Sequence, residues 1–199
     1  MDVGCGRGVV VEYLRAKGID CLGVELANVE ISLPLSRYVL TGLSSLSLPN
    51  IQKGSFDTLM FLDVLEHIDN PKVFLQEHVD NYKSVKYVLI ALPARSELWT
   101  NYDDFYGHYQ RYSFNSFKKE LLLDGWEIAG ISYAFRWLYP LTYLYSLFKF
   151  KRSVKINAPS TFAKPIHLFL SLLSKVDFRI LPRFFWGTSI FCVIKKSEQ

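Results

Sequence analysis

Three closely spaced glycines near the start of the chain constrain its fold more than any other feature. They lie in the run Asp2-Val3-Gly4-Cys5-Gly6-Arg7-Gly8, and the apolar run that follows, residues 9–14, has helical character. Glycine tolerates positive φ angles and carries no Cβ, so a ligand can reach the backbone of such a turn. A strand that passes through glycines into a helix also presents backbone N–H groups at the start of that helix. The segment predicts a nucleotide-like ligand; a glycine turn without a ligand is the alternative.

The spacing of the glycines and the position of the acid indicate which ligand it is. The pattern is G-x-G-x-G, tighter than the G-x-G-x-x-G of dinucleotide enzymes, and Asp2 precedes the first glycine. A carboxylate at that point favours a cationic ligand over a pyrophosphate. S-adenosyl-L-methionine, which carries an amino group and a sulfonium, fits this requirement, and the segment resembles motif I of the class I methyltransferases. A different nucleotide-dependent α/β enzyme is disfavoured, because the sequence has neither G-x-G-x-x-G nor G-x-x-x-x-G-K-[ST].

Two further segments follow at the distances that such a fold requires. Residues 20–25 form a short apolar strand that ends in Glu25, about 20 residues beyond the glycines, where an α/β nucleotide site places an acid against the ribose hydroxyls. Residues 56–62 read as a buried parallel strand, and an acid-rich turn with Asp63, Glu66 and His67 follows it. Taken alone, Glu25 could equally be a solvated loop residue.

With these three segments in register, the chain resembles a class I S-adenosylmethionine-dependent methyltransferase and is similar to the branch that includes the ubiquinone-biosynthesis O-methyltransferases. The resemblance covers residues 2 to about 133 and resumes near 186–196. It implies S-adenosyl-L-methionine as the methyl donor. It also implies roles for six residues: the methionine end of the donor lies on Asp2, Gly4 and Gly6, the ribose on Glu25, and Asp63 and Val64 border the bound molecule.

The chain departs from the family pattern at two places. Family members often bond the adenine amino group with an acid near the position of Leu43 or Ser44, where this chain offers only hydroxyls or backbone. In the family the glycine turn also follows several apolar strand residues, whereas Met1 here directly precedes Asp2. We therefore expect a truncated first strand, either from a start placed too far downstream or from a fragment. Because unpaired buried backbone groups are costly, we expect a version extended upstream to be more stable.

The remaining pattern predicts the fold class and the domain organisation. Strands and helices alternate, which indicates an α/β, doubly wound, mostly parallel, seven-stranded Rossmann-like sheet, with the ligand at the carboxyl ends of the strands. A length of 199 residues suits a single domain over 1–199, and 50% hydrophobic residues suffice for its core. Expected helices are 8–16, 28–35, 71–82 and 114–123 with Ser113 as the cap, and expected strands are 21–25, 38–41, 56–62, 87–93, 126–133 and 189–195.

A basic, aromatic helical insertion at about 134–185 precedes the last strand. Residues 134–199 carry 11 Lys and Arg against 2 Asp and Glu, and no acid occurs in 134–176. The apolar stretches 137–148 and 166–173 are shorter than the roughly 18 residues that span a bilayer. Apolar-aromatic residues followed by Lys149, Lys151 and Arg152 are typical of a helix that lies on an anionic membrane surface, here through 134–155. A cap over the site or a dimer face is the alternative, and the oligomeric state stays open.

The candidates for chemistry are His67, which follows the fourth strand, and His108, which lies just before a helix. For O-methylation, a histidine of near-neutral pKa is a natural base for the hydroxyl proton. Asp63, Glu66, His67 and His108 also resemble an arrangement that binds Mg²⁺ or Mn²⁺ in some ubiquinone-pathway and small-RNA 2′-O-methyltransferases. A purely structural role is the third reading. His78, inside a predicted helix, is expected at the surface.

The sequence thus predicts a methyltransferase that acts on an oxygen of a small or lipid-linked acceptor. The alternatives are a non-catalytic or degenerate S-adenosylmethionine-binding module and an RNA 2′-O-methyltransferase. Nucleic acid is a weak candidate partner, because the aromatics lie in apolar runs rather than interleaved with basic residues. Widely spaced Cys5, Cys21 and Cys192 favour reduced thiols and a cytoplasmic protein. The basic, aromatic insertion adds peripheral membrane association to this prediction.

Overall fold

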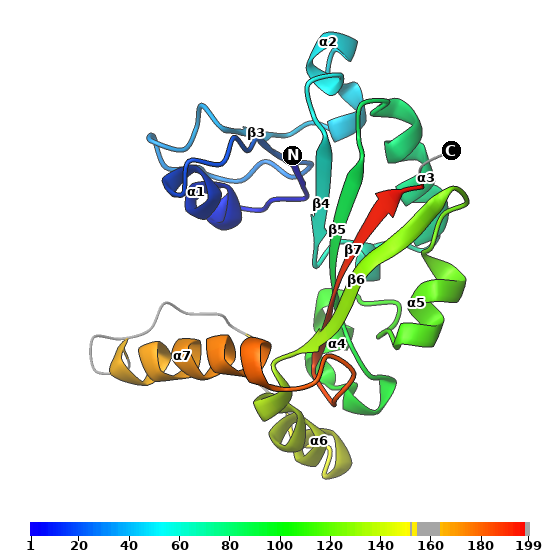
Figure 1. Cartoon of the computed structure of the whole chain (residues 1–199). Helices are drawn as coiled ribbons and strands as arrows, with labels where there is room; N and C mark the ends of the chain where they lie inside the picture. Colours follow the sequence, from blue (N-terminus) through cyan, green and yellow to red (C-terminus); the bar gives the residue numbers. More distant parts are fainter. Residues whose placement is uncertain (152, 155–163, 198–199) are drawn as a thin grey trace.

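The computed structural model, which describes residues 1–151, 153–154 and 164–197, is built on one seven-stranded sheet in the order β3-β2-β1-β4-β5-β7-β6 (Figure 1). The first five strands in this order are parallel, and β7 is antiparallel to both β5 and β6. The predicted fold class, a mostly parallel seven-stranded sheet, is therefore confirmed. The strands are β1 Asp2–Val3, β2 Gly23–Glu25, β3 Val39–Thr41, β4 Thr58–Leu62, β5 Tyr87–Pro93, β6 Trp126–Ala134 and β7 Ser189–Lys196.

The central strand β1 has only two residues and lies between β2 and β4. Asp2 and Val3 pair with Gly23 and Val24 on one side and with Met60 and Phe61 on the other. The amino group of Met1 donates to the carbonyl of Thr58 at 2.7 Å. A cavity of about 650 Å³ adjoins this end of β1, and Met1, Leu22 and Phe56 are among its lining residues.

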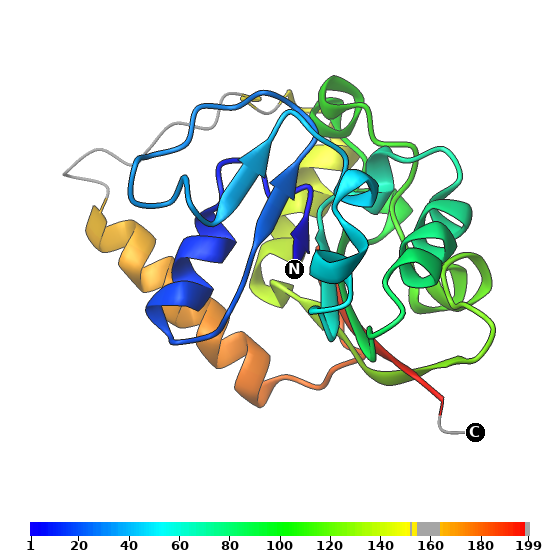
Figure 2. The ribbon, with the colours of Figure 1, turned by 90° about the horizontal axis from the view of Figure 1, so that it is seen from above.

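Helices cover both faces of the sheet. α1 (Val9–Ala16) packs on one face, and α3 (Pro71–Asn81) and α5 (Phe114–Glu120) lie on the other, as the two views show (Figures 1 and 2). Each helix starts where the sequence predicts: Pro71 occupies the first turn of α3, and Ser113 caps α5 by accepting the Ser116 N–H. The short helix α2 (Asn50–Lys53) lies at the opposite end of the sheet from the carboxyl ends of the parallel strands (Figure 1).

Three more helices gather at the carboxyl ends of the parallel strands: α4 (Asn101–Tyr106), α6 (Tyr139–Leu147) and α7 (Lys164–Ile180) (Figure 1). A buried ion pair anchors the insertion, because Arg136 Nη1 lies 3.0 Å from Asp177 Oδ2 of α7 and both side chains are almost fully buried. The Arg136 guanidinium also donates to the carbonyl of Pro182 and to Ser132 Oγ. The start of α6 and the end of α7 are thereby fixed to the end of β6. None of the helices in the described part of the chain is both long and apolar enough to cross a membrane.

Three local predictions were wrong. Residues 28–32 have no regular structure and residues 33–35 form turns, rather than a helix, because Pro34 lacks a backbone N–H and disfavours helical geometry in the residue before it. The helix capped by Ser113 ends at Glu120 rather than 123. His78 is 1% exposed rather than on the surface. Its Nε2 lies 2.9 Å from Ser45 Oγ and its Nδ1 lies 2.8 Å from the Phe74 carbonyl oxygen, and burial lowers its pKa.

Candidate functional site

The glycine turn between β1 and α1 leaves its backbone open and also touches the end of β4. Gly4 has φ +73°, and a Cβ added there would lie 2.7 Å from Val64 Cγ2. Gly6 has φ +54°, and an added Cβ would meet nothing within 4 Å. Gly4 therefore permits a close approach between two elements, whereas Gly6 borders open space that a ligand can use. The structure brings Gly4, Gly6 and Val64, all predicted site residues, to one place.

Two carboxylates lie beside this turn. Asp2 is 2% exposed, and burial raises its pKa to about 6, with the charge of Glu25 adding to the increase and the terminal amino group opposing it. Glu25 Oε2 accepts the Gly6 N–H at 2.9 Å, and Glu25 Oε1 accepts the Ala27 N–H at 2.9 Å. A cation bound here would offset the cost of these two negative charges. The residues present therefore fit a ligand with an amino group and a sulfonium.

Leu43 and Ser44 stand where the family often has an adenine-binding acid, and the hydroxyl of Ser44 is used within the protein. Ser44 Oγ accepts the backbone N–H of Leu46 and thereby caps a short 3₁₀-helix, η1 (Ser45–Ser47). The Leu43 N–H donates to the carbonyl of Glu25 at 3.4 Å, close to the ribose-binding candidate. Leu43 therefore lies beside Glu25, and the side-chain oxygen of Ser44 already accepts a hydrogen bond.

The turn after β4 presents Asp63 in a conformation that L-residues rarely adopt. Its φ is +55°, and its N–H donates to the Ala91 carbonyl at 3.1 Å. A backbone conformation of this kind costs about 1 to 3 kcal/mol, and it persists only where the surrounding structure fixes it. Desolvation raises the pKa of Asp63, and the neighbouring His108 and His67 partly oppose that shift. The carboxylate therefore lies within electrostatic reach of both predicted histidines.

His67 and His108 meet although 41 residues separate them in the sequence. Their rings lie 4.8 Å apart between centroids, at an interplanar angle of 72°. His67 belongs to the 3₁₀-helix η2 (Leu65–His67), and the Tyr109 N–H donates to the Glu66 carbonyl at 2.8 Å, which ties the two segments together. Burial lowers the pKa of His67, and His108 lowers it further. His67 is thus favoured in its neutral form, which can accept a proton.

Asp103, which was not predicted as a site residue, forms a hydrogen bond with His108. Asp103 is fully buried, and its Oδ1 lies 2.9 Å from His108 Nδ1. Arg111 donates to both carboxylate oxygens, at 2.7 and 3.1 Å, and the Thr100 N–H donates to Oδ2 at 2.8 Å. Burial raises the pKa of Asp103, but the Arg111 bonds and charge, with those from Thr100 and His108, more than offset it and lower the pKa. The pattern Thr100-x-x-Asp103 was the available signal, because it is a helix-capping motif.

Glu66 completes a candidate metal-binding cluster. It is 1% exposed, and within the described residues its Oε2 has no hydrogen-bond partner. Burial raises the pKa of Glu66 to about 8, and the charge of Asp63 contributes to the shift. One ligand atom from each of Glu66, His67 and His108 lies within 4.8 Å of the others, a group that does not include the predicted Asp63. A carboxylate with two imidazoles suits a divalent cation such as Mn²⁺ better than Mg²⁺, which prefers oxygen ligands.

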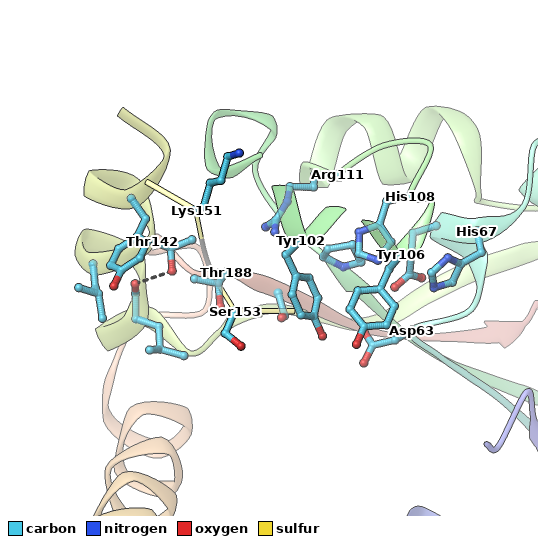
Figure 3. Close-up of a pocket in the computed structure, with 16 residues that line it drawn as sticks. Asp63, His67, Tyr102, Tyr106, His108, Arg111, Thr142, Lys151, Ser153 and Thr188 are labelled. Atoms are coloured by element: carbon cyan, nitrogen blue, oxygen red, sulfur yellow. Dashed lines mark hydrogen bonds between the residues drawn. The ribbon is translucent and has the colours of Figure 1, made fainter. Parts of the chain in front are cut away.

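Asp63, Glu66, His67, His108 and Arg111 line one pocket of about 630 Å³. Figure 3 shows Asp63, His67 and His108 at one end of it, Thr142 of α6 at the other, and Tyr102 and Tyr106 between them. The pocket thus has one end with the two histidines and a second end built by the insertion. None of the described residues that line it belongs to the glycine turn. It is lined by Asp63, Glu66, His67, Pro93, Tyr102, Tyr106, His108, Arg111, Leu138, Leu141, Thr142, Tyr145, Lys151, Ser153, Thr188 and Ser189.

Comparison with known proteins identifies a family and named relatives. A family model described as "Methyltransferase domain" matches residues 1–149. A protein named "Ubiquinone biosynthesis O-methyltransferase" from Methylococcus capsulatus is 32% identical over 78 residues, which cover 36% of this chain and 33% of that protein. Its namesake from Dechloromonas aromatica is 26% identical over 172 residues, covering 75% of this chain and 72% of that protein. With the first of these relatives, the match spans only about a third of the relative's length.

Solved structures share the fold at low sequence identity. An S-adenosylmethionine-dependent methyltransferase from Mesorhizobium loti superposes with a TM-score of 0.54 at 11% identity, covering 98% of this chain and 89% of that one. The plantazolicin methyltransferase BpumL, solved with a triazolic desmethylPZN analog and SAH, also gives a TM-score of 0.54, at 13% identity, covering 99% and 76%.

Proposed function

The chain belongs to the methyltransferase domain family, and we propose that it is an S-adenosylmethionine-dependent methyltransferase that methylates an oxygen atom of a small or lipid-linked acceptor. The observation that carries this proposal is the pair of His67 and His108, whose rings lie 4.8 Å apart in a pocket that Asp63 also lines. Asp63 is followed by Val64, the residue that an added Cβ at Gly4 would meet. The name of the relatives, which are O-methyltransferases, supports the choice of oxygen.

In this proposal the glycine turn and the two acids hold the methyl donor. Asp2 neutralises the cationic methionine end, Gly4 and Gly6 leave room for it against the backbone, and Glu25 accepts hydrogen bonds from the ribose hydroxyls. Glu25 already accepts the Gly6 and Ala27 N–H groups, which fix its carboxylate beside the turn. Each carboxylate oxygen has a second lone pair that remains available for a ribose hydroxyl.

The histidines act on the acceptor. When bound, S-adenosylmethionine supplies an electrophilic methyl group, so the protein has to align the acceptor oxygen and remove its proton. With its Nδ1–H donated to Asp103, His108 presents the lone pair of Nε2 and accepts the hydroxyl proton there. His67, favoured in the neutral form, orients the hydroxyl from the other side. Asp63 and Val64 border the donor at the end of β4.

A divalent cation on Glu66, His67 and His108 is the second candidate role for this cluster. The buried Glu66 Oε2, unpartnered within the described residues, supports it, because a metal would satisfy that oxygen and remove the reason for its raised pKa. The Asp103–His108 bond is also the kind of outer contact that orients a metal-bound imidazole. Such an ion would lower the pKa of the acceptor hydroxyl, so that water could take its proton without a histidine base.

Single substitutions and chelation separate the two roles. His67→Ala and His108→Ala should each lower turnover about 10²-fold or more, while the affinity for S-adenosylhomocysteine stays within about twofold. Activity that survives EDTA supports a histidine base, and activity lost to EDTA and restored by Mn²⁺ supports the metal. Full activity in the double His variant would contradict both roles.

We also propose that the insertion contacts an anionic membrane surface, which would suit a lipid-linked acceptor. Residues 134–199 carry 11 basic against 2 acidic residues, and Asp177, one of the two acids, is buried against Arg136. Large apolar side chains are exposed on and after α7, including Leu168, Phe169, Leu172, Ile180, Phe184 and Trp186. Exposed apolar and basic side chains on one element are typical of helices that lie in a membrane interface.

A further inference from the structure

We infer that Leu141 is a specificity-determining residue, and that α6 forms an apolar wall that selects acceptors with an apolar group next to the reacting hydroxyl. The inference rests on the proposed O-methylation. It assigns the α6 end of the pocket to the apolar group of the acceptor. The insertion therefore has a role in acceptor recognition that is independent of any membrane contact.

The first step is the placement of one helical face. Leu138, Leu141, Thr142 and Tyr145 all line the pocket. Their spacing of three, four and seven residues places them on the same side of η4 (Arg136–Leu138) and α6. Thr142 donates its hydroxyl to the Leu138 carbonyl at 3.0 Å, so its polar group is already paired. Leu138, Leu141 and the ring of Tyr145 thus make this wall mainly apolar.

The second step is the rigidity of the wall. Ser146 Oγ donates to the Trp99 carbonyl at 3.0 Å, and Tyr139 Oη lies 3.2 Å from Glu97 Oε1, so both ends of α6 are bonded to the segment between β5 and α4. The ring of Tyr139 also stacks on Trp186, with centroids 5.6 Å apart. The Arg136–Asp177 ion pair fixes the residue where η4 begins. A wall held at this many points can discriminate shape.

The third step is the middle of the pocket, between α6 and the histidines. Tyr102 and Tyr106 of α4 line it, with ring centroids 4.5 Å apart (Figure 3). A bound molecule would lie between these aromatic rings and the leucines of α6, with its hydroxyl at His67 and His108. Lys151 lies toward the α6 end, as Figure 3 shows, but Leu138 and Leu141 make part of that end apolar, and this part gains from an apolar substituent. A polar substituent against these two leucines would lose water without finding a partner in them.

Leu144 provides a matched control on the same helix. Leu141 is 54% exposed and Leu144 is 47% exposed, yet only Leu141 lines the pocket. Replacing either leucine by Asp therefore places a charge at a similarly exposed site. Any general effect on folding or solubility should be similar in the two variants. Only Leu141→Asp introduces a charge into the proposed acceptor site.

The probes are phenol, 4-ethylphenol and 4-butylphenol, which share a hydroxyl and differ in apolar length. Binding is measured by calorimetry with the protein saturated by S-adenosylhomocysteine, so no turnover is required. In the unaltered protein, affinity should rise about two- to fourfold for each methylene that becomes buried. Leu141→Asp should weaken 4-butylphenol binding by about tenfold or more and leave phenol binding nearly unchanged. Leu144→Asp should match the unaltered protein.

Two results would overturn the inference while the methyltransferase assignment stands. One is normal S-adenosylhomocysteine binding with affinity for the phenols that does not grow with chain length, including no binding at all. The other is an equal loss in Leu141→Asp and Leu144→Asp. Failure of S-adenosylhomocysteine to bind the unaltered protein would instead contradict the donor site.

Discussion

His108 Nδ1 lies 2.9 Å from the Oδ1 atom of Asp103, a carboxylate that is itself fully buried. The pair resembles the orienting bond of other proton-transferring or metal-binding histidines, in which a carboxylate fixes the ring and leaves Nε2 for chemistry. Arg111 shares the same carboxylate, so the charge of Asp103 is balanced within the protein. Asp103 is therefore a positioning residue, and α4 is the element that carries it.

Asp103→Asn should lower kcat about 10²-fold or more without changing the affinity for S-adenosylhomocysteine. Five donor atoms now share the two carboxylate oxygens of Asp103, and an amide would offer them only one oxygen, so His108 loses its fixed orientation. Turnover and calorimetry on the same preparation measure the two effects. Asp104→Asn, on the exposed side of α4, should leave kcat unchanged. Equal losses of kcat in both variants would show that only the stability of α4 matters.

Gly4→Ala should destabilise the protein more than Gly18→Ala does. Both glycines have φ near +75°, so both substitutions incur the cost of a left-handed alanine, about 1 to 2 kcal/mol. Only at Gly4 would the new Cβ meet Val64, and overpacking of this kind costs about 1 to 3 kcal/mol more. Urea denaturation measures the difference. Val64→Ala should recover part of the Gly4→Ala loss, and a purely additive double variant would argue against the contact.

Glu66 should make the metal-free protein less stable as the pH rises from about 4.5 to 8. Its pKa is raised to about 8 in the folded state, so its stabilising contribution is complete below the ordinary value of 4.5 and is lost as the pH rises through the folded value. The free energy of unfolding of Glu66→Gln should lack this component, which is at most on the order of a few kcal/mol. Urea titrations in EDTA at pH 5, 6.5 and 8 test it. A constant difference between the two proteins at all three pH values would contradict the shift.

The insertion should bind vesicles that contain anionic lipid and release them as salt rises. Each basic residue near such a surface contributes about 1 kcal/mol, screened beyond about 8 Å at physiological ionic strength. Co-sedimentation with anionic and with neutral vesicles measures the effect. Lys149→Glu with Lys151→Glu should weaken it, whereas Lys118→Glu with Lys119→Glu, on α5, should not. Equal sedimentation with both lipids would remove the reason to favour a lipid-linked acceptor.

The parts of the fold that local sequence dictates could be predicted. The sheet and the predicted donor site could be located from the glycine turn, the acid at the end of β2 and the apolar runs of β4 and β5. Each of these signals lies within a few adjacent residues. The burial of His78 was also readable, since Leu75, His78, Val79 and Tyr82 recur at helical spacing and form the buried face of α3. The assignment of His78 to the surface followed its polarity rather than this periodicity.

The parts that depend on contacts between distant segments could not be predicted. Nothing near Asp103 in the sequence indicates that its carboxylate reaches both His108 and Arg111, because the intervening turn decides where they point. The Arg136–Asp177 pair joins residues 41 positions apart across the insertion. The same holds for Leu141, whose place in the pocket follows from how α6 packs against residues 96–99.

Titration calorimetry with S-adenosylhomocysteine, comparing the unaltered chain with Glu25→Ala and Glu30→Ala, tests the central claim most directly. We expect one binding site per chain. Glu25→Ala should lower the affinity for S-adenosylhomocysteine by about tenfold or more, because charge-assisted bonds to the ribose hydroxyls are worth about 1.5 to 3 kcal/mol. Glu30→Ala, which removes an acid from the neighbouring loop, should bind like the unaltered chain. No heat of binding from a protein that circular dichroism shows to be folded, or equal affinities in all three, would contradict the assignment of the donor site.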